Sequence, residues 1–461
     1  MTPSAMQILF APPAPTAHRG PNVEPRDVQR RFNAPLDPRA ELAGIIPAPV
    51  LATLSDTDAR LFYHYIDVQA TISVGVETED NPLSTYFIPV ALSAALGESN
   101  GDSGPNDGNP AFHALKACAA THRANLMDGT GTDGSAAFRQ VAQSARKRAY
   151  ALLAERIEVL SRASPLEREQ FAGALAIVSL PFWVCANSQL VSLAVVDGNT
   201  RLLPRLLQAY SVRLQTADTP SANELFFISA ISLYQAWYNF NLVVILDQPL
   251  MPLLCEMARD PLTLSPPVED VFAVPPGIAL EHMRVYHVIR EYRGAMRDGA
   301  ENGRRELAAQ VEADELVTSL GHAICADLEA RDREPRGEGV ARRKAVGRLL
   351  HHAALRALLL REVFHCSRTD TAVQECVAHA LSSLQSIKWG TESGLLIPLM
   401  VLSTAALERE RLQFRDFMVR LCWKGSVGPR AALRTLDMVI DDKALDWRDA
   451  LRKVGSGLIL V

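Results

Sequence analysis

The chain has 461 residues, of which 47 are basic and 52 are acidic, and its net charge is −5. This balance excludes proteins that hold nucleic acid through the charge of a whole domain, because such binding needs a concentrated basic surface. Hydrophobic residues make up 48% of the chain, which excludes global disorder and supplies a large core.

Residues 1–50 are rich in proline and lack a sustained hydrophobic period, which predicts a disordered leader. The first twenty residues have no basic region followed by a long apolar run, so they do not resemble a signal peptide. We therefore expect a protein that is not secreted. Residues 51–461 are predicted to form a single all-α domain, a large multi-helix bundle or solenoid.

The first strong helical signal is the stretch DARLFYHYID, residues 58–67. Ser55 is a predicted N-cap, and Leu61, Tyr65 and Val68 share one face at helical spacing. Helical periodicity or composition then recurs along the chain, over 111–127, 136–163, 201–216, 222–247, 279–330, 340–366, 370–388, 393–424 and 428–453. No alternation of strands and helices and no internal repeat is present, which favours an all-α fold.

Loops and helix starts are marked by turn residues. Residues 98–110 and 129–135 are turn-rich breaks, and 262–278 is a proline-rich linker with little helical character. Ser164, Pro165 and Glu167 form the pattern of a capping box and predict a helix start.

The most apolar long run is 225–246, which raises the question of a membrane span. It contains two serines, a glutamine and two asparagines, and aromatic residues occur all along it. These polar residues favour a buried core helix over a transmembrane helix, and we expect no membrane association.

The cysteines are too scattered to form a thiolate zinc cluster. They are seven in number and contain no CxxC pair, and they lie at Cys118, Cys185, Cys255, Cys325, Cys366, Cys376 and Cys422. An odd, dispersed set in a long chain is typical of reduced, mostly buried thiols.

Three groups of residues could carry chemistry. His64 could act as a general base oriented by Asp67, or the aromatic-rich helix around it could simply pack into the core. The adjacent His351 and His352 point to different faces of a helix, which argues against a metal site. Residues 331–348 contain seven basic side chains, which indicate either a solvated helix face or a nuclear-import-like patch at ARRK.

Several segments follow one another in a distinctive order: DARLFYHYID, NPLSTYFIPVAL (81–92), HALKACAATH (113–122), the helix FRQVAQSARKRAYALLAERI, the apolar stretch 389–414 with Pro398 and Arg411, and DWRDAL (446–451). Their order resembles the fungal-specific transcription factor regulatory domain of zinc-cluster regulators. The resemblance extends from about residue 50 to the end of the chain. It implies an all-helical regulatory domain with an apolar interior and no catalytic residues.

Regulators of that family carry a six-cysteine zinc module near the N-terminus, whereas this sequence has no cysteine before Cys118. We therefore expect no direct DNA contact from this chain alone. The resemblance implies a nuclear or cytoplasmic protein that acts through a protein partner or a small-molecule effector. A role in secondary metabolism and a homodimeric state are both open alternatives. Candidate residues lining an effector site are Trp183, Trp237 and Tyr238, and core packing is the simpler alternative for all three.

The alternative hypothesis is an enzyme of secondary metabolism, such as a terpene cyclase that works in an apolar helical interior. Such an enzyme would need aromatic side chains for carbocations and a magnesium or lysine site for a diphosphate. The candidate residues are Lys388, Glu392, Asp441 and Asp442. If the chain is a regulator, we expect no cofactor. If it is a cyclase-like enzyme, we expect magnesium.

Overall fold

The computed structural model describes residues 37–43, 45–46, 48–70, 81–93, 107–130, 134–179, 205–215, 219–257, 265–298, 303–334, 339–387, 394–422, 427–442 and 445–454. Within these ranges the secondary structure is helical and contains no strand, which confirms the all-α prediction. None of the described helices is long and apolar enough to cross a membrane.

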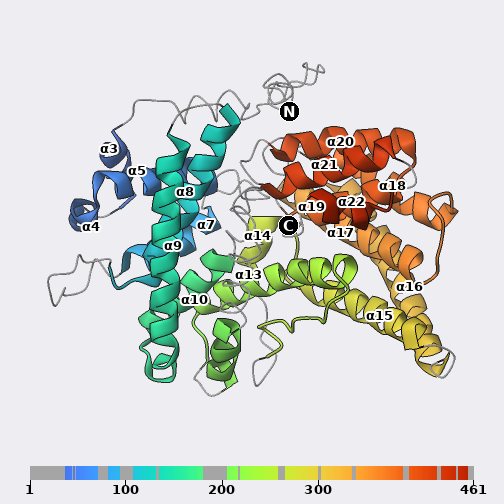
Figure 1. Ribbon diagram of the computed structural model, residues 1–461, viewed down its shortest axis with the longest axis horizontal. Coiled ribbons are helices and arrows are strands. Elements are labelled where there is room, and N and C mark those ends of the chain that lie inside the picture. The colour runs from blue at the N-terminus through green and yellow to red at the C-terminus, as the bar shows by residue number, and fades with distance from the viewer. Residues whose placement is uncertain are drawn as a thin grey trace.

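The N-terminal group of helices precedes residue 180 (Figure 1). Its members are α3 (Pro38–Leu42), α4 (Ala48–Thr53), α5 (Asp56–His64), the π-helical turn η1 (Tyr65–Ala70), α7 (Pro82–Leu92), α8 (Pro110–Thr130), α9 (Ser135–Ile157), the 3₁₀ turn η3 (Leu160–Arg162) and α10 (Pro165–Ser179). The long helices α8 and α9 form an antiparallel hairpin, and α10 packs against α7, α8 and α9.

The middle of the chain contributes a further helix over 205–215 and the elements that cross the centre of the molecule. These are α13 (Ala222–Asn239), the π-helical turn η4 (Phe240–Ile245) and α14 (Pro267–Phe272). Because α13 contacts α10 on one side and α15 on the other, it joins the N-terminal helices to the C-terminal ones.

The C-terminal group begins with α15, and its helices pack against one another in chain order (Figure 1). Its members are α15 (Ile278–Asp298), α16 (Gly303–Arg333), α17 (Val340–Glu362), α18 (Thr371–Leu384), α19 (Leu396–Ala405), α20 (Glu408–Cys422), α21 (Val427–Asp441) and α22 (Trp447–Val454). The long α17 lies inside this group, in contact with α15, α16, α18 and α19.

Two predicted helix starts are confirmed. The Ser55 side chain accepts a hydrogen bond from the Asp58 amide at 3.1 Å and caps α5. At the start of α10, the Ser164 hydroxyl accepts from the Glu167 amide, and the Glu167 carboxylate accepts from the Ser164 amide. Both caps satisfy amides that have no partner within the helix.

Two predicted boundaries differ from the structure. Residues 1–36 of the expected leader lie outside the described residues, but α3 and the start of α4 fall within 1–50, and Leu42 and Val50 are buried in the core. The linker 262–278 contains the short helix α14, because Pro266 and Pro267 stand at its N-terminus, where the missing amide hydrogen costs nothing.

Helix α13 is apolar on all its sides and is buried along almost its whole length, as the run 225–246 predicts. Its polar side chains bond to the backbone of the segment 251–255, which forms no regular helix or strand. Asn239 bonds both the amide and the carbonyl of Met251, each at 2.7 Å. Gln235 accepts from the Leu254 amide at 2.7 Å, and Ser232 accepts from the Cys255 amide at 3.1 Å.

These bonds explain why an otherwise apolar helix keeps polar residues in the core. A buried backbone group without a partner is costly, and α13 provides partners where the irregular segment has none. The segment 251–255 is thereby fixed along α13, and Leu253, Leu254 and Cys255 enter the core.

We predict that Asn239→Leu lowers the free energy of unfolding by about 2–5 kcal/mol, because it leaves two buried backbone groups of Met251 without a partner. Urea unfolding followed by circular dichroism would measure this. The matched control is Asn223→Leu on the same helix, where the side chain is half-buried and, within the described part of the chain, bonds only to Glu169. Equal stability of the two variants would contradict the role of Asn239.

Candidate functional site

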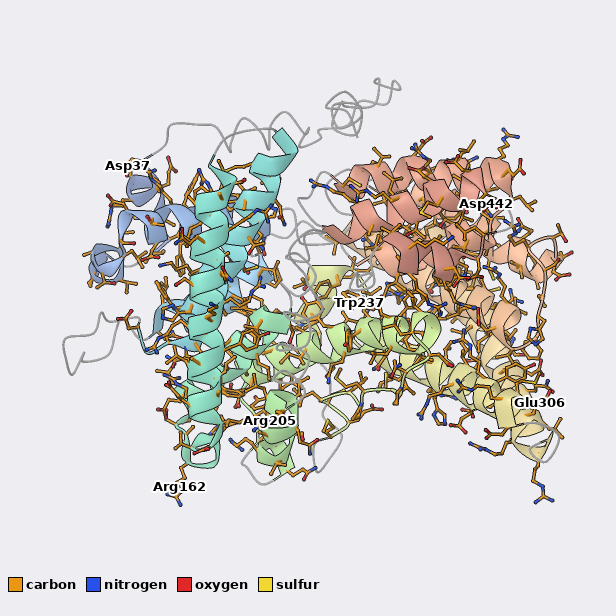
Figure 2. All side chains as sticks on the ribbon, in the orientation of Figure 1. Asp37, Arg162, Arg205, Trp237, Glu306 and Asp442 are labelled. Carbon is orange, nitrogen blue, oxygen red and sulfur yellow. The ribbon has the colours of Figure 1, made fainter. Side chains whose placement is uncertain are left out.

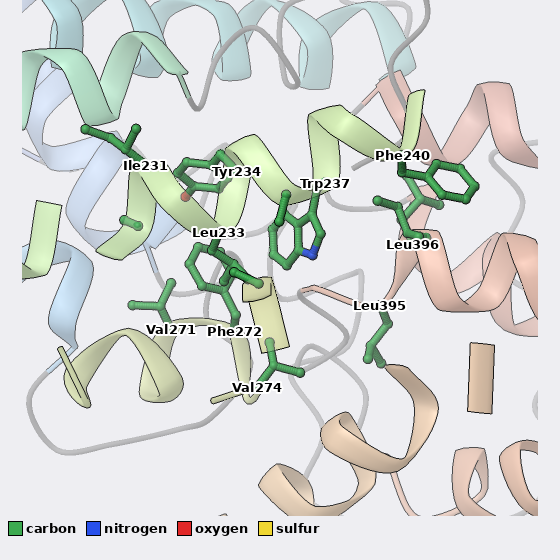
Figure 3. Packing of buried hydrophobic residues seen from close by; sticks show 14 of the residues in the cluster. Ile231, Leu233, Tyr234, Trp237, Phe240, Val271, Phe272, Val274, Leu395 and Leu396 are labelled. Atoms are coloured by element: carbon green, nitrogen blue, oxygen red, sulfur yellow. The ribbon is translucent and has the colours of Figure 1, made fainter. Parts of the chain in front are cut away.

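Trp237 lies near the C-terminal end of α13 at the centre of the molecule, and only 3% of its surface is exposed (Figure 3). Its ring meets Phe272 of α14 edge to face at 5.2 Å and Tyr234 at 5.9 Å between centroids. The His351 ring of α17 is stacked nearly parallel to it, at 12° and 6.4 Å. Side chains of α13, α14 and α17 therefore surround one indole.

The indole Nε1–H of Trp237 is buried and has no hydrogen-bond acceptor among the described residues. In Figure 3 the nitrogen points toward the side where Leu395 and Leu396 lie, and these side chains have no acceptor to offer. A buried donor without a partner costs about 1–3 kcal/mol and is uncommon in a native core. The position therefore calls for an explanation beyond packing.

Two glycines let the backbone of α14 approach this site closely. A Cβ on Gly347 of α17 would stand 2.0 Å from the Ala273 carbonyl oxygen, so only glycine fits there. Gly394 has φ +78°, and a Cβ there would stand 2.9 Å from the Phe272 carbonyl oxygen. The end of α14 is held in this way against both α17 and the start of α19.

A chain of hydrogen bonds runs beside Trp237 through two buried histidines. The Tyr286 hydroxyl lies 2.5 Å from His282 Nδ1, and His282 Nε2 lies 2.9 Å from His351 Nδ1. His351 Nε2 lies 3.0 Å from the Gly394 carbonyl oxygen. Burial lowers the pKa of His351 to about 3, and burial together with His351 also depresses the pKa of His282, so both rings are neutral.

The direction of every bond in this chain follows from its last acceptor. The Gly394 carbonyl can only accept, so His351 Nε2 carries the hydrogen and Nδ1 accepts. His282 must then donate from Nε2 and accept at Nδ1 from the Tyr286 hydroxyl. With both rings neutral, this chain ties the start of α19 to α15.

His352, the next residue along α17, has the opposite electrostatic environment. Its Nδ1 lies 2.7 Å from Asp327 of α16 and its Nε2 lies 2.9 Å from Glu281 of α15. Burial opposes the charge, but the two carboxylates outweigh it and raise the pKa of His352 to about 9. The adjacent histidines thus point to different faces of α17, as predicted, and His351 is neutral whereas His352 is charged.

The three predicted effector residues differ from one another in burial and in whether the structure describes them. Trp237 is buried as described above, whereas its neighbour Tyr238 is only half-buried, and burial raises its pKa. Trp183 lies outside the described residues. The structure therefore describes two of the three.

The residues predicted for a cyclase do not form a site in the part of the chain that is described. Asp441 and Asp442 are exposed at the end of α21, and Figure 2 shows Asp442 away from Trp237. Lys388 and Glu392 lie outside the described residues. Among the described residues, no group of three or more histidine, cysteine or acidic side chains is arranged to hold a metal ion.

His64 and Asp67 belong to the opening helical stretch. His64 is 2% exposed, and its Nε2 lies 3.0 Å from His122 Nδ1 of α8. Burial, together with His122 and Arg123, depresses the pKa of His64 well below its usual range. Leu61, Tyr65 and Val68 are all buried, so this stretch packs α5 and η1 into the core, as the structural alternative predicts.

The basic side chains of the stretch ARRK (341–344) are buried or bond to other parts of the protein. Lys344 lies 2.6 Å from Asp270, and Arg342 donates to the Arg331 carbonyl. Arg343 is buried. These contacts favour a structural role over an exposed linear import signal.

The residues that sequence reasoning missed are His282, Tyr286 and Gly347. The two histidines of the chain of hydrogen bonds are 69 residues apart, so no local pattern connects them. A glycine inside the strongly helical run 340–362 was the one available signal, because such a glycine often marks a close packing contact.

Residues 60–461 match the fungal-specific transcription factor domain. This match spans most of the chain and agrees with the resemblance seen in the ordered sequence segments. The chain belongs to this family, and it is transcription-regulator-like. No curated protein and no solved structure matches it.

The two opposite histidine pKa shifts predict stability that declines on both sides of neutral pH. The pKa of His351 is about 3 in the folded protein, against 6.5 for a free histidine side chain, so protonation favours the unfolded chain and stability falls as the pH drops below 6.5. The pKa of His352 is about 9, so its contribution is present below 6.5 and is lost as the pH rises through 9. Each full proton changes the free energy of unfolding by about 1.4 kcal/mol per pH unit.

Urea unfolding between pH 4.5 and 9.5 would measure how the free energy of unfolding declines on the acid side and on the alkaline side, called here the acid and alkaline limbs. His352→Gln should flatten the alkaline limb, while His351→Gln should reduce the acid limb, to which His282 and His64 also contribute with the same sign. An alkaline limb unchanged by His352→Gln would contradict the assignment.

Proposed function

We propose that this protein is a transcription regulator whose helical domain binds a small-molecule effector beside Trp237. Membership of the fungal-specific transcription factor domain family supports the regulatory role. The observation that carries the effector site is the buried indole N–H without an acceptor among the described residues. A ligand oxygen would remove the cost of that donor, so the ligand gains a bond that the protein alone lacks.

The surroundings of the indole favour a neutral and largely apolar ligand. Phe272, Val274, Leu395 and Leu396 lie around Trp237, and each is at most 5% exposed. His351 is neutral, so it offers no charge to an anion. The proposed effector is therefore an apolar metabolite with one carbonyl or similar acceptor, which fits a regulator of secondary metabolism.

The site is placed where binding can change the domain. Trp237 is stacked on His351, and His351 donates to the Gly394 carbonyl just before α19. A ligand that binds one arrangement of these elements more tightly shifts the population toward it. In this proposal the regulator acts in the nucleus, and a partner or a separate module contacts the DNA.

The cyclase hypothesis has no comparable support. The two aspartates proposed for magnesium are exposed at the end of α21. We therefore propose neither a catalytic step nor a cofactor.

Thermal unfolding of the purified full chain tests the effector site. A panel of neutral, apolar metabolites with one carbonyl group would be compared with prenyl diphosphates plus magnesium. Because ligand binding to the native state raises the unfolding midpoint, we expect members of the first panel to raise it and the diphosphates to leave it unchanged. Trp237→Phe removes the N–H and keeps a ring, and should weaken binding by about tenfold or more.

The matched control is Trp447→Phe, which makes the same chemical change in α22, where Trp447 packs on Phe240. It should leave the ligand response intact. An unchanged response of Trp237→Phe would contradict the site, and a magnesium-dependent response to diphosphates would favour the enzyme hypothesis instead.

A further inference from the structure

The outer face of α16 exposes an unusual pair of apolar side chains. Leu307 is 61% exposed and Val311, one turn further on, is 54% exposed. The opposite face of the helix packs into the protein through the buried residues Ala309, Ala313 and Leu316. Leu307 and Val311 therefore take no part in that packing. In Figure 2 the first turns of α16, marked by Glu306, lie at the outer edge of the molecule.

A basic and an acidic residue flank this pair, one on each side along the helix. Arg304 and Glu315 are eleven residues apart, which is about three helical turns, so they project from the same side of α16. Both are exposed, and within the described residues neither makes an ion pair or a hydrogen bond. Ala308 and Val311 lie between them on the same stripe, at helical spacing.

The stripe Arg304, Ala308, Val311 and Glu315 is complementary to itself when reversed. If a second copy of the helix runs antiparallel, Arg304 of each copy faces Glu315 of the other, and the small Ala308 faces the larger Val311. A twofold axis between Ala308 and Val311 produces two equivalent ion pairs around an apolar centre, as an isologous interface requires. Leu307 lies beside the stripe and adds apolar area.

We propose that this stripe of α16 is the contact surface between two copies of the chain, packed antiparallel about that axis. The charge pattern selects a second copy over an unrelated partner, because one helix supplies both halves of each ion pair. Like charges placed opposite each other would oppose assembly, so the same residues set the orientation of the pair.

Charge reversal tests the proposal with the full chain. Arg304→Glu places two acidic residues opposite each other, and Glu315→Arg places two basic residues opposite each other. By analytical ultracentrifugation we expect each variant to self-associate about tenfold more weakly than the wild type. Mixing the two variants should restore association, because every contact is then between opposite charges, and the double variant should dimerise by itself.

The control is Arg409→Glu on α20, an exposed arginine without an ion pair among the described residues. It makes the same charge change on another face and should leave dimerisation unchanged. A wild-type chain that remains monomeric at all concentrations would overturn the proposal. A dimer that ignores both charge reversals, or a mixture that fails to associate, would also overturn it.

Discussion

The burial of α13 on all its sides is the constraint on which the rest of the structure depends. A helix that is apolar all round needs protein against every face, so helices from both halves of the chain must pack on it. Contacts with α10 and α15 meet this need, and the segment 251–255 covers a further side through bonds to Asn239, Gln235 and Ser232. The two groups of helices are therefore parts of one core rather than independent units.

The candidate site is a consequence of this central position. Trp237 is buried because it lies on α13, and the close approach of α14 to Gly347 closes its surroundings. The same packing strips water from His282 and His351, which keeps them neutral and fixes the direction of their hydrogen bonds. Among the described residues, one indole N–H is left without an acceptor, whereas the polar groups of α13 that bond the segment 251–255 are satisfied. This contrast supports a binding role for Trp237.

Much of the fold could be predicted from the sequence because local signals define helices. Ser55 and Ser164 mark helix starts, and the largely apolar run 225–246 correctly indicates a buried helix. Helix α14 was missed because prolines that begin a helix resemble prolines that break one. The histidine chain could not be predicted, since its partners are distant in sequence. Trp237 could be proposed as a candidate, but its missing acceptor depends on how three separate elements meet.

Native-state hydrogen exchange is the most direct test of the claim that α13 joins both halves into one core. The account predicts that the slowest amides of α8, α13 and α17 exchange with the same free energy, equal to that of global unfolding, because none of these helices can be exposed without the others. Exchange of the α13 amides through a separate, lower-energy opening, while α8 or α17 stays protected, would contradict it.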